Sequence, residues 1–178
     1  MTRFFTSTLV LLLITFASCK TQSPDLYYSK TTKSTDIFWG FGSKDLKSFI
    51  EFRDANNLVA IQNNRKVKTI SIQEHIETFL IPNVESYIME IESLKPTEET
   101  KDMINASLAL YNFAHETYKN DYIAIAQLID NREDATTIQD LMIHLDQEKR
   151  KKLKSLYQDL MQTSVPYAKQ HDLTVSRF

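Results

Sequence analysis

The chain has 178 residues, of which 42% are hydrophobic and 25% charged, and its formal net charge is −2. This balance suits one compact domain with an apolar core and argues against a disordered chain. Because the chain carries no excess of positive charge, it lacks the electrostatic footprint of a nucleic-acid-binding protein, and we expect no nucleic-acid partner.

Glycine and cysteine are unusually scarce. Both glycines, Gly40 and Gly42, precede a long segment that contains none. Tight hairpin turns and β-bulges depend on residues that tolerate a positive φ, chiefly glycine, so a sheet-rich fold is improbable and an all-α fold is expected. With Cys19 as the only cysteine, no disulfide can form within the chain, and the core must hold by packing.

The first nineteen residues have the order of a bacterial export signal. Arg3 supplies a positive charge, and the apolar stretch from Leu9 to Phe16 is about half as long as the ~20 residues that a membrane span needs. Small residues then lead to the cysteine in the sequence Ala17-Ser18-Cys19. We therefore interpret residues 1–18 as a signal peptide.

This ending resembles the lipobox of bacterial lipoproteins. The resemblance implies that Cys19 receives a diacylglyceryl group, becomes the acylated mature N-terminus and would be labelled by palmitate. Lys20 follows the cysteine, where the inner-membrane retention signal of enteric lipoproteins has aspartate, so the resemblance favours the outer membrane, facing the periplasm. The alternative is an ordinary secretory signal with an incidental cysteine.

Residues 19–36 are predicted to be the lipidated N-terminus and a flexible linker. They are rich in Ser, Thr and Lys and show no helical or alternating apolar pattern. The seventeen residues from Lys20 to Asp36 would span roughly 20 to 25 Å if flexible. Residues 37–178 would then form the folded domain.

The domain begins with an aromatic cluster. Phe38, Trp39 and Phe41 are interleaved with the two glycines, and they either close one end of a bundle or contact a partner or membrane interface. Ser43 is a good N-cap for a helix that runs to about Asn56. Residues 58–72 are open to two interpretations: a helix and loop, which we prefer, or a small hairpin around residues 63–66.

Three further stretches have helical spacing of apolar residues. The first runs from Ser71 to Leu94, with Pro82 expected to kink or split it. The second, from Glu98 to about Asp130, carries the clearest seam, and the third begins near Thr136 and is kinked or ended by Pro166. Short connections between long helices predict an antiparallel bundle of about four helices.

The best candidate site lies on the seam of the second long helix. Four residues place polar tips on this otherwise apolar stripe and would line a ligand cavity between helices, namely Tyr111, His115, Tyr118 and Tyr122. The alternative is that the tyrosine hydroxyls reach the bundle surface and the histidine bonds a neighbour.

No catalytic, metal or cofactor signature is present in the sequence. None of the four histidines has the glutamate three residues earlier that carboxylate-bridged metal bundles use. A nucleophile elbow, a glycine-rich phosphate loop and a His-Glu-x-x-His motif are also missing. We therefore expect no metal, no cofactor and no catalytic residues.

These features support three hypotheses of function. The first is a membrane-anchored envelope lipoprotein whose bundle binds a protein or peptide partner without catalysis. The second is a periplasmic bundle that binds a small ligand or metal through the four-residue seam. The third is a cell-envelope hydrolase without a recognisable motif.

Overall fold

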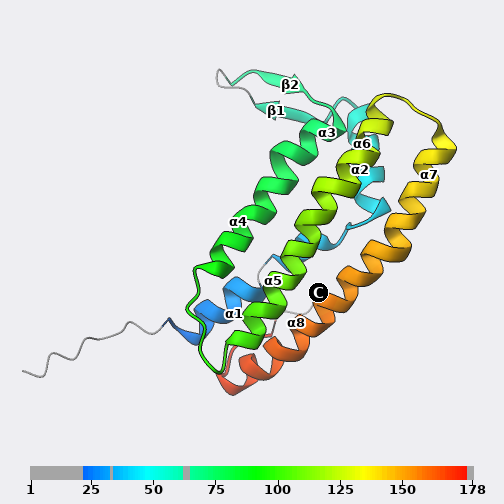
Figure 1. The fold of residues 1–178 in the computed structure, drawn as a ribbon. Helices are drawn as coiled ribbons and strands as arrows, with labels where there is room; N and C mark the ends of the chain where they lie inside the picture. Colours follow the sequence, from blue (N-terminus) through cyan, green and yellow to red (C-terminus); the bar gives the residue numbers. More distant parts are fainter. Residues whose placement is uncertain (1–21, 33, 62–64, 176–178) are drawn as a thin grey trace, which may run out of the picture.

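The computed structural model describes residues 22–32, 34–61 and 65–175, and these form an antiparallel α-helical bundle (Figure 1). Three long helices make up its body, and each passes through a π-helical turn (η) without breaking. In chain order their parts are α3 (Ile72–His75), η2 (Ile76–Leu80) and α4 (Ile81–Glu92); α5 (Lys101–Thr117), η3 (Tyr118–Tyr122) and α6 (Ile123–Asp130); and α7 (Ala135–His144), η4 (Leu145–Arg150) and α8 (Lys151–Gln170). The predicted helical bundle is confirmed.

Two shorter helices complete the bundle. Helix α1 (Pro24–Thr32) packs against α4, α5 and α8, and helix α2 (Ser43–Asp54) packs against α3. A short 3-10 turn, η1 (Thr35–Phe38), lies between them. Figure 1 shows α1 at the lower end of the bundle and the connection from α2 to α3 at the upper end, so the N-terminal segment runs the length of the molecule.

The linker prediction is wrong for residues 24–32, because α1 is an integral part of the bundle. Tyr27 and Tyr28 are buried, although they stand next to each other in a polar stretch. The threonines beside them are buried as well because their hydroxyls bond back into the helix: Thr31 Oγ1 donates to the Tyr27 carbonyl at 2.8 Å and Thr32 Oγ1 to the Tyr28 carbonyl at 2.7 Å. Because these hydroxyls are hydrogen-bonded within the helix, the polar composition that suggested a linker is compatible with burial.

A small hairpin follows α2, so our preferred helix-and-loop interpretation of residues 58–72 is wrong and the hairpin alternative is confirmed. Strands β1 (Val59–Ile61) and β2 (Val67–Thr69) pair antiparallel, with Ile61 opposite Val67. Beyond the strands, the Ile70 N–H donates to the Leu58 carbonyl at 2.9 Å, and both side chains are buried. The proposed turn residues Asn63 and Asn64 lie outside the described residues.

Both prolines inside long helices lie within segments that continue past them. Pro82 cannot donate a hydrogen bond to the carbonyl of Thr78, and Thr78 lies within η2. The wider π turn accommodates this missing bond, so the helix is neither split nor ended. Pro166 lies inside α8, which continues to Gln170, so the expectation that Pro166 ends the helix is wrong.

The core is one continuous cluster that runs between the helices. Most of the predicted seam of the second long helix is buried, including Ile104, Tyr111, Tyr118, Tyr122, Ile125 and Ile129. Among the described residues, no helix is both long enough and apolar enough to cross a bilayer. Cys19 and the predicted signal peptide lie outside the described residues.

Candidate functional site

The two glycines position the start of α2 against the rest of the bundle. Gly42 has a φ of 108°, which side chains rarely allow, and a Cβ atom there would collide with the Asp146 carboxylate. A Cβ atom at Gly40 would overlap the Asp45 carboxyl group. Both glycines are therefore places where a carboxyl group approaches the backbone closely.

Asp146 of η4 holds the first turn of α2. Its Oδ1 accepts a hydrogen bond from the Ser43 N–H at 2.9 Å, and its Oδ2 accepts one from the Ser43 hydroxyl at 2.5 Å. Ser43 was predicted as the N-cap, but it is the first helical residue, and Gly42 takes the cap position. A carboxylate from another helix thus satisfies a free amide at the positive end of α2.

Tyr122 of η3 joins the same segment. Its hydroxyl accepts a hydrogen bond from the Gly42 N–H at 2.5 Å, and it lies 3.2 Å from both the Gly42 carbonyl and Asp45 Oδ2, to which it donates. The phenol is fully buried. Burial, followed by the nearby Asp45 charge, raises the pKa of Tyr122 well above its ordinary value, so it stays protonated and remains a donor.

Asp45 is the electrostatically unusual group of the site. Burial raises the pKa of its carboxyl from 3.8 to about 6, against the opposing effects of the Tyr122 hydrogen bond and of the charges on Lys44 and Arg150. Asp45 is therefore poised to change protonation just below neutral pH. Groups with such pKa values are enriched at functional sites, although structural networks produce them too.

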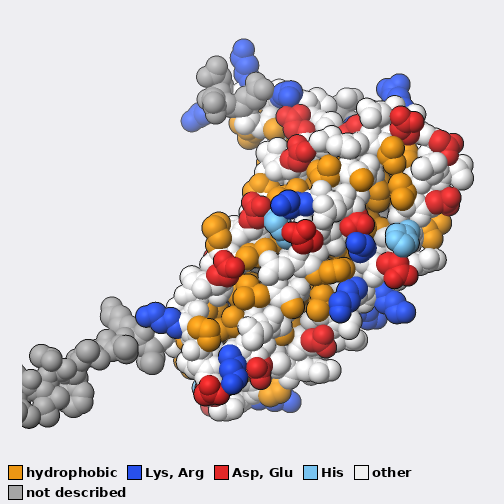
Figure 2. Space-filling model, viewed as in Figure 1, with side chains coloured by type: hydrophobic (Ala, Val, Ile, Leu, Met, Phe, Trp, Pro, Cys, Tyr) orange, Lys and Arg blue, Asp and Glu red, His pale blue; other side chains and the backbone are white. Residues whose placement is uncertain are grey.

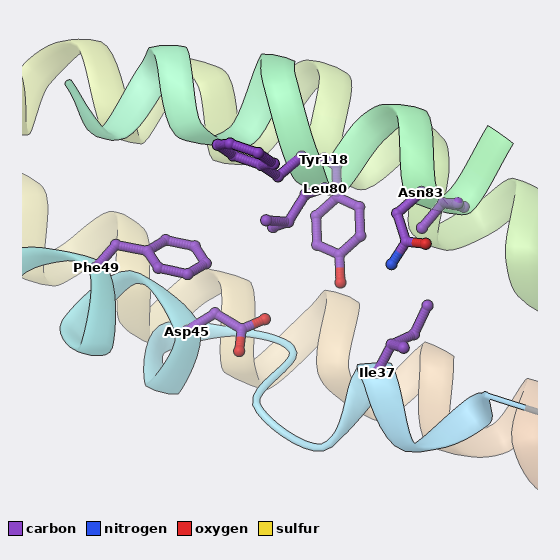
Figure 3. Close-up of a pocket in the computed structure, with 8 residues that line it drawn as sticks. Ile37, Asp45, Phe49, Leu80, Asn83 and Tyr118 are labelled. Atoms are coloured by element: carbon purple, nitrogen blue, oxygen red, sulfur yellow. The ribbon is translucent and has the colours of Figure 1, made fainter. Parts of the chain in front are cut away.

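Asp45 opens into a cavity of about 270 Å³, shown in Figure 3. Its walls are mostly apolar, and Tyr118, from η3, directs its hydroxyl toward the space between Asp45 and Ile37. We call this hollow the Asp45 cavity and define it by the residues Ile37, Asp45, Phe49, Phe79, Leu80, Asn83, Val84 and Tyr118. An apolar hollow with a few convergent polar groups is the usual form of a small-molecule site.

Two aspects of Tyr118 suit it to a ligand. Only 2% of the residue is exposed, and burial raises the pKa of its hydroxyl well above the ordinary value. Its hydroxyl is directed into the cavity, as Figure 3 shows. A buried phenol that faces a cavity is a donor for whatever occupies the cavity.

The three π-helical turns of the described chain meet around this segment. Turn η2 contributes Phe79 and Leu80 to the cavity wall, η3 contributes Tyr118 and the Tyr122 hydroxyl, and η4 contributes Asp146 beneath Gly42. π turns are rare and occur frequently at functional sites. Their convergence at one place marks the start of α2 as the candidate site.

The structure divides the four predicted site residues between different places. Tyr118 lines the Asp45 cavity, whereas Tyr122 does not line it but donates a hydrogen bond to Asp45. Tyr111 is buried between aromatic rings, with its ring centroid 5.2 Å from that of Phe38. His115 is half-buried and pairs through Nε2 with Glu85 at 2.9 Å. That any of the four binds a ligand stays a prediction.

Asp45 and Asn83 were not singled out from the sequence. A signal for Asp45 was present in the Gly-x-Gly pattern shortly before it, because glycines in a chain that otherwise avoids them mark a close approach. Within the described residues, no group of three or more His, Cys, Asp or Glu side chains is arranged to hold a metal ion.

Comparisons with known proteins add no relative. No protein-family model, no curated protein and no solved structure matches this chain. Any functional assignment therefore rests on the geometry of the site and the pattern of the sequence.

Proposed function

We propose that this chain is a lipid-anchored binding protein of the bacterial cell envelope, and that its bundle holds a small, mostly apolar ligand in the Asp45 cavity without catalysis. One observation carries the proposal: the buried Tyr118 hydroxyl and the Asp45 carboxyl both face an apolar-walled hollow of about 270 Å³. For comparison, an apolar cavity of roughly 150 Å³ binds benzene. The hollow therefore has room for a substituted ring or a short branched chain.

The site is better suited to binding than to acid–base catalysis. Hydrolysis by paired carboxyl groups requires two that are free to exchange protons with the substrate. Asp146 is the second carboxyl near the cavity, and both of its oxygens accept hydrogen bonds from Ser43. Asp45 is thus the single carboxyl in the cavity wall, where it can orient a ligand.

The α1 end of the bundle would lie close to the membrane. The Gln22 side chain is fixed to the loop after α4, where Oε1 accepts from the Lys95 N–H at 2.8 Å. Only three peptide steps separate Cys19 from Gln22, a reach of at most about 10 Å. A lipid on Cys19 would therefore hold the folded domain against the headgroups.

Binding in the cavity can be tested by filling it. Ile37→Phe places a larger side chain in the cavity wall, whereas Ile143→Phe makes the same change at a residue on α7 that is 43% exposed. We expect small apolar probes such as toluene to bind the wild type and the Ile143 variant, as measured by ligand-observed NMR, and to lose affinity for Ile37→Phe. Equal binding to all three proteins would contradict the proposal.

The anchor has a separate test. Metabolic labelling with palmitate should tag the wild-type protein, and Cys19→Ala should abolish the tag. Detergent should release the wild type from membranes, whereas salt should not, because acyl chains are held by the hydrophobic effect. An untagged wild-type protein would contradict the lipid anchor but not ligand binding in the Asp45 cavity.

A second candidate function, binding of a protein or peptide partner, is favoured by the hairpin. Ile61 and Val67 face each other across the strands and are 76% and 65% exposed. The hairpin projects from the end of the bundle opposite α1, as Figure 1 shows, so it would point away from the anchoring membrane. An exposed apolar strand pair is a known mode of partner recognition.

Charge substitution tests this second function. Ile61→Lys should abolish a crosslink to a partner in native membranes, whereas Met89→Lys should not, because Met89 is similarly exposed but lies on α4. A crosslink that survives Ile61→Lys would exclude the hairpin as the contact.

A further inference from the structure

Two hollows of opposite charge flank the segment between α1 and α2. The Asp45 cavity contains one carboxyl group and no basic side chain in its wall. The second hollow, of about 340 Å³, lies on the α8 side, and its wall holds the cations Arg150 and Lys154 against one carboxylate, Asp36. Figure 2 shows basic side chains gathered over the first part of α8. The charged side chains in the two walls thus differ in net sign.

Asp45 has no cation in contact with it. Among the described residues, no Lys, Arg or His nitrogen lies within ion-pair distance of its carboxylate, and its hydrogen bond comes from the neutral Tyr122 phenol. Lys44 and Arg150 influence the carboxyl only through their electrostatic field. Buried charges in proteins are normally paired with an opposite charge. The ionised Asp45 carboxylate has no such partner in the described part of the chain, and a cationic ligand in the hollow can supply one.

Resting on the proposed function, we propose that the ligand of the Asp45 cavity carries a protonated amine on a small apolar body, and that its ammonium group binds the Asp45 carboxylate while the apolar body fills the hollow. The ammonium group can also bond to the Tyr118 phenol, because the phenol oxygen can accept a hydrogen bond from an N–H group. The apolar body contacts Phe49, Phe79 and Val84. Aromatic faces beside the site would attract the cation further.

The groups that face Asp45 from each packed element determine how binding depends on pH. The charges of Lys44, which is exposed on α2, and of Arg150 on η4 both favour the ionised carboxyl. The Tyr118 and Tyr122 phenols of η3 stay protonated because burial raises their pKa values. On α3, His75 lies between the Phe49 and Phe79 rings, at 4.8 and 5.2 Å, and burial lowers its pKa, so it is neutral near pH 7.

With its pKa near 6, Asp45 is about 90% ionised at pH 7 and about 10% ionised at pH 5. If only the ionised form binds the ammonium, apparent affinity scales with that fraction and falls roughly tenfold between pH 7 and pH 5. Protonation of His75 at low pH acts in the same direction. The Asp45→Asn variant separates the two effects because it retains His75.

The experiment compares benzylamine with benzyl alcohol, which has a similar shape but no charge. Binding of both probes to the full chain in lipid nanodiscs is measured by titration calorimetry at pH 5 and pH 7. Asp45→Asn is the test variant. Asp140→Asn makes the same change on the exposed surface of α7 and serves as the matched control. Empty nanodiscs correct for the affinity of each probe for lipid.

We expect benzylamine to bind at least about tenfold more tightly than benzyl alcohol at pH 7, as a charge-assisted hydrogen bond allows. That advantage should shrink roughly tenfold at pH 5 and disappear in Asp45→Asn but not in Asp140→Asn. Equal binding of the two probes would overturn the amine assignment and leave the proposed function standing. Binding of neither probe would overturn both. A pH effect of the same size in Asp45→Asn as in the wild type would overturn the role of Asp45 and assign the effect to His75.

Discussion

Replacing Asp45 with asparagine removes the ionisable group of the cavity while keeping the shape of the side chain. In the folded protein, burial raises the pKa of Asp45 from its ordinary 3.8 to about 6. The folded state therefore holds more protons than the unfolded state between about pH 4 and pH 6. Because stability falls with pH wherever the folded state binds more protons, ionisation of Asp45 destabilises the protein as pH rises through this window.

The size of the effect follows from the same pKa values. A rise from 3.8 to about 6 corresponds to roughly 3 kcal/mol at ~1.36 kcal/mol per pKa unit. An asparagine cannot ionise and can still accept the Tyr122 hydrogen bond, so it should avoid this cost. The variant should be more stable than the wild type by roughly 2 to 3 kcal/mol at pH 7, or roughly 4 to 12 °C in melting temperature for a chain of this length.

Thermal unfolding followed by circular dichroism from pH 4 to pH 8 measures the effect. The difference in melting temperature between Asp45→Asn and the wild type should be near zero at pH 4, open between pH 4 and pH 6, and stay constant above pH 7. Asp140→Asn should show no such difference. A constant gap at every pH, or a variant less stable than the wild type at pH 7, would refute the assignment of a raised pKa to Asp45.

Three further substitutions test the contacts around the cavity. Gly42→Ala should lower the free energy of unfolding by roughly 2 to 3 kcal/mol, measured by denaturant titration, because φ is 108° and the new Cβ meets Asp146; a loss below ~0.5 kcal/mol would contradict it. Asp146→Ala should cost about 1 to 2 kcal/mol through the lost cap of α2, an effect that should be absent in Asp140→Ala. Tyr122→Phe should raise the pKa of Asp45 further, since its hydrogen bond lowers that pKa, as seen by ¹³C NMR of the carboxyl; an unchanged pKa would show that the bond is not made in solution.

The elements that could be predicted from the sequence are those in which local pattern and packing agree. The seam of the second long helix alternates spacings of four and three, and Ile104, Tyr111 and Ile125 of that seam are buried as expected. Helix α1 could not be found in this way, because its burial comes from adjacent tyrosines and from threonines that satisfy their hydroxyls internally. A polar composition does not exclude a helix when its hydroxyls bond to its own backbone.

The candidate site depends on contacts between residues far apart in the chain, and this is why its composition was only partly predicted. Tyr122 could be predicted as a site residue because it lies on a clear apolar stripe of its helix. Asp45 could not, because only its contact with Tyr122 makes it part of the site. The hydrogen bond between Asp146 and Ser43 joins the start of α2 to the last long helix, and no periodic pattern in the sequence indicates it. Hydrophobic periodicity predicts which face of a helix is buried, but it does not predict which polar group that face meets.

Several unusual features meet around the start of α2. Gly42 adopts a positive φ, three helices widen into π turns, and Asp45 holds a carboxyl group in surroundings that disfavour its charge. Local strain and a destabilised charge persist where something other than stability maintains them. Their coincidence around a hollow that the Tyr118 phenol faces is why we propose ligand binding in the Asp45 cavity.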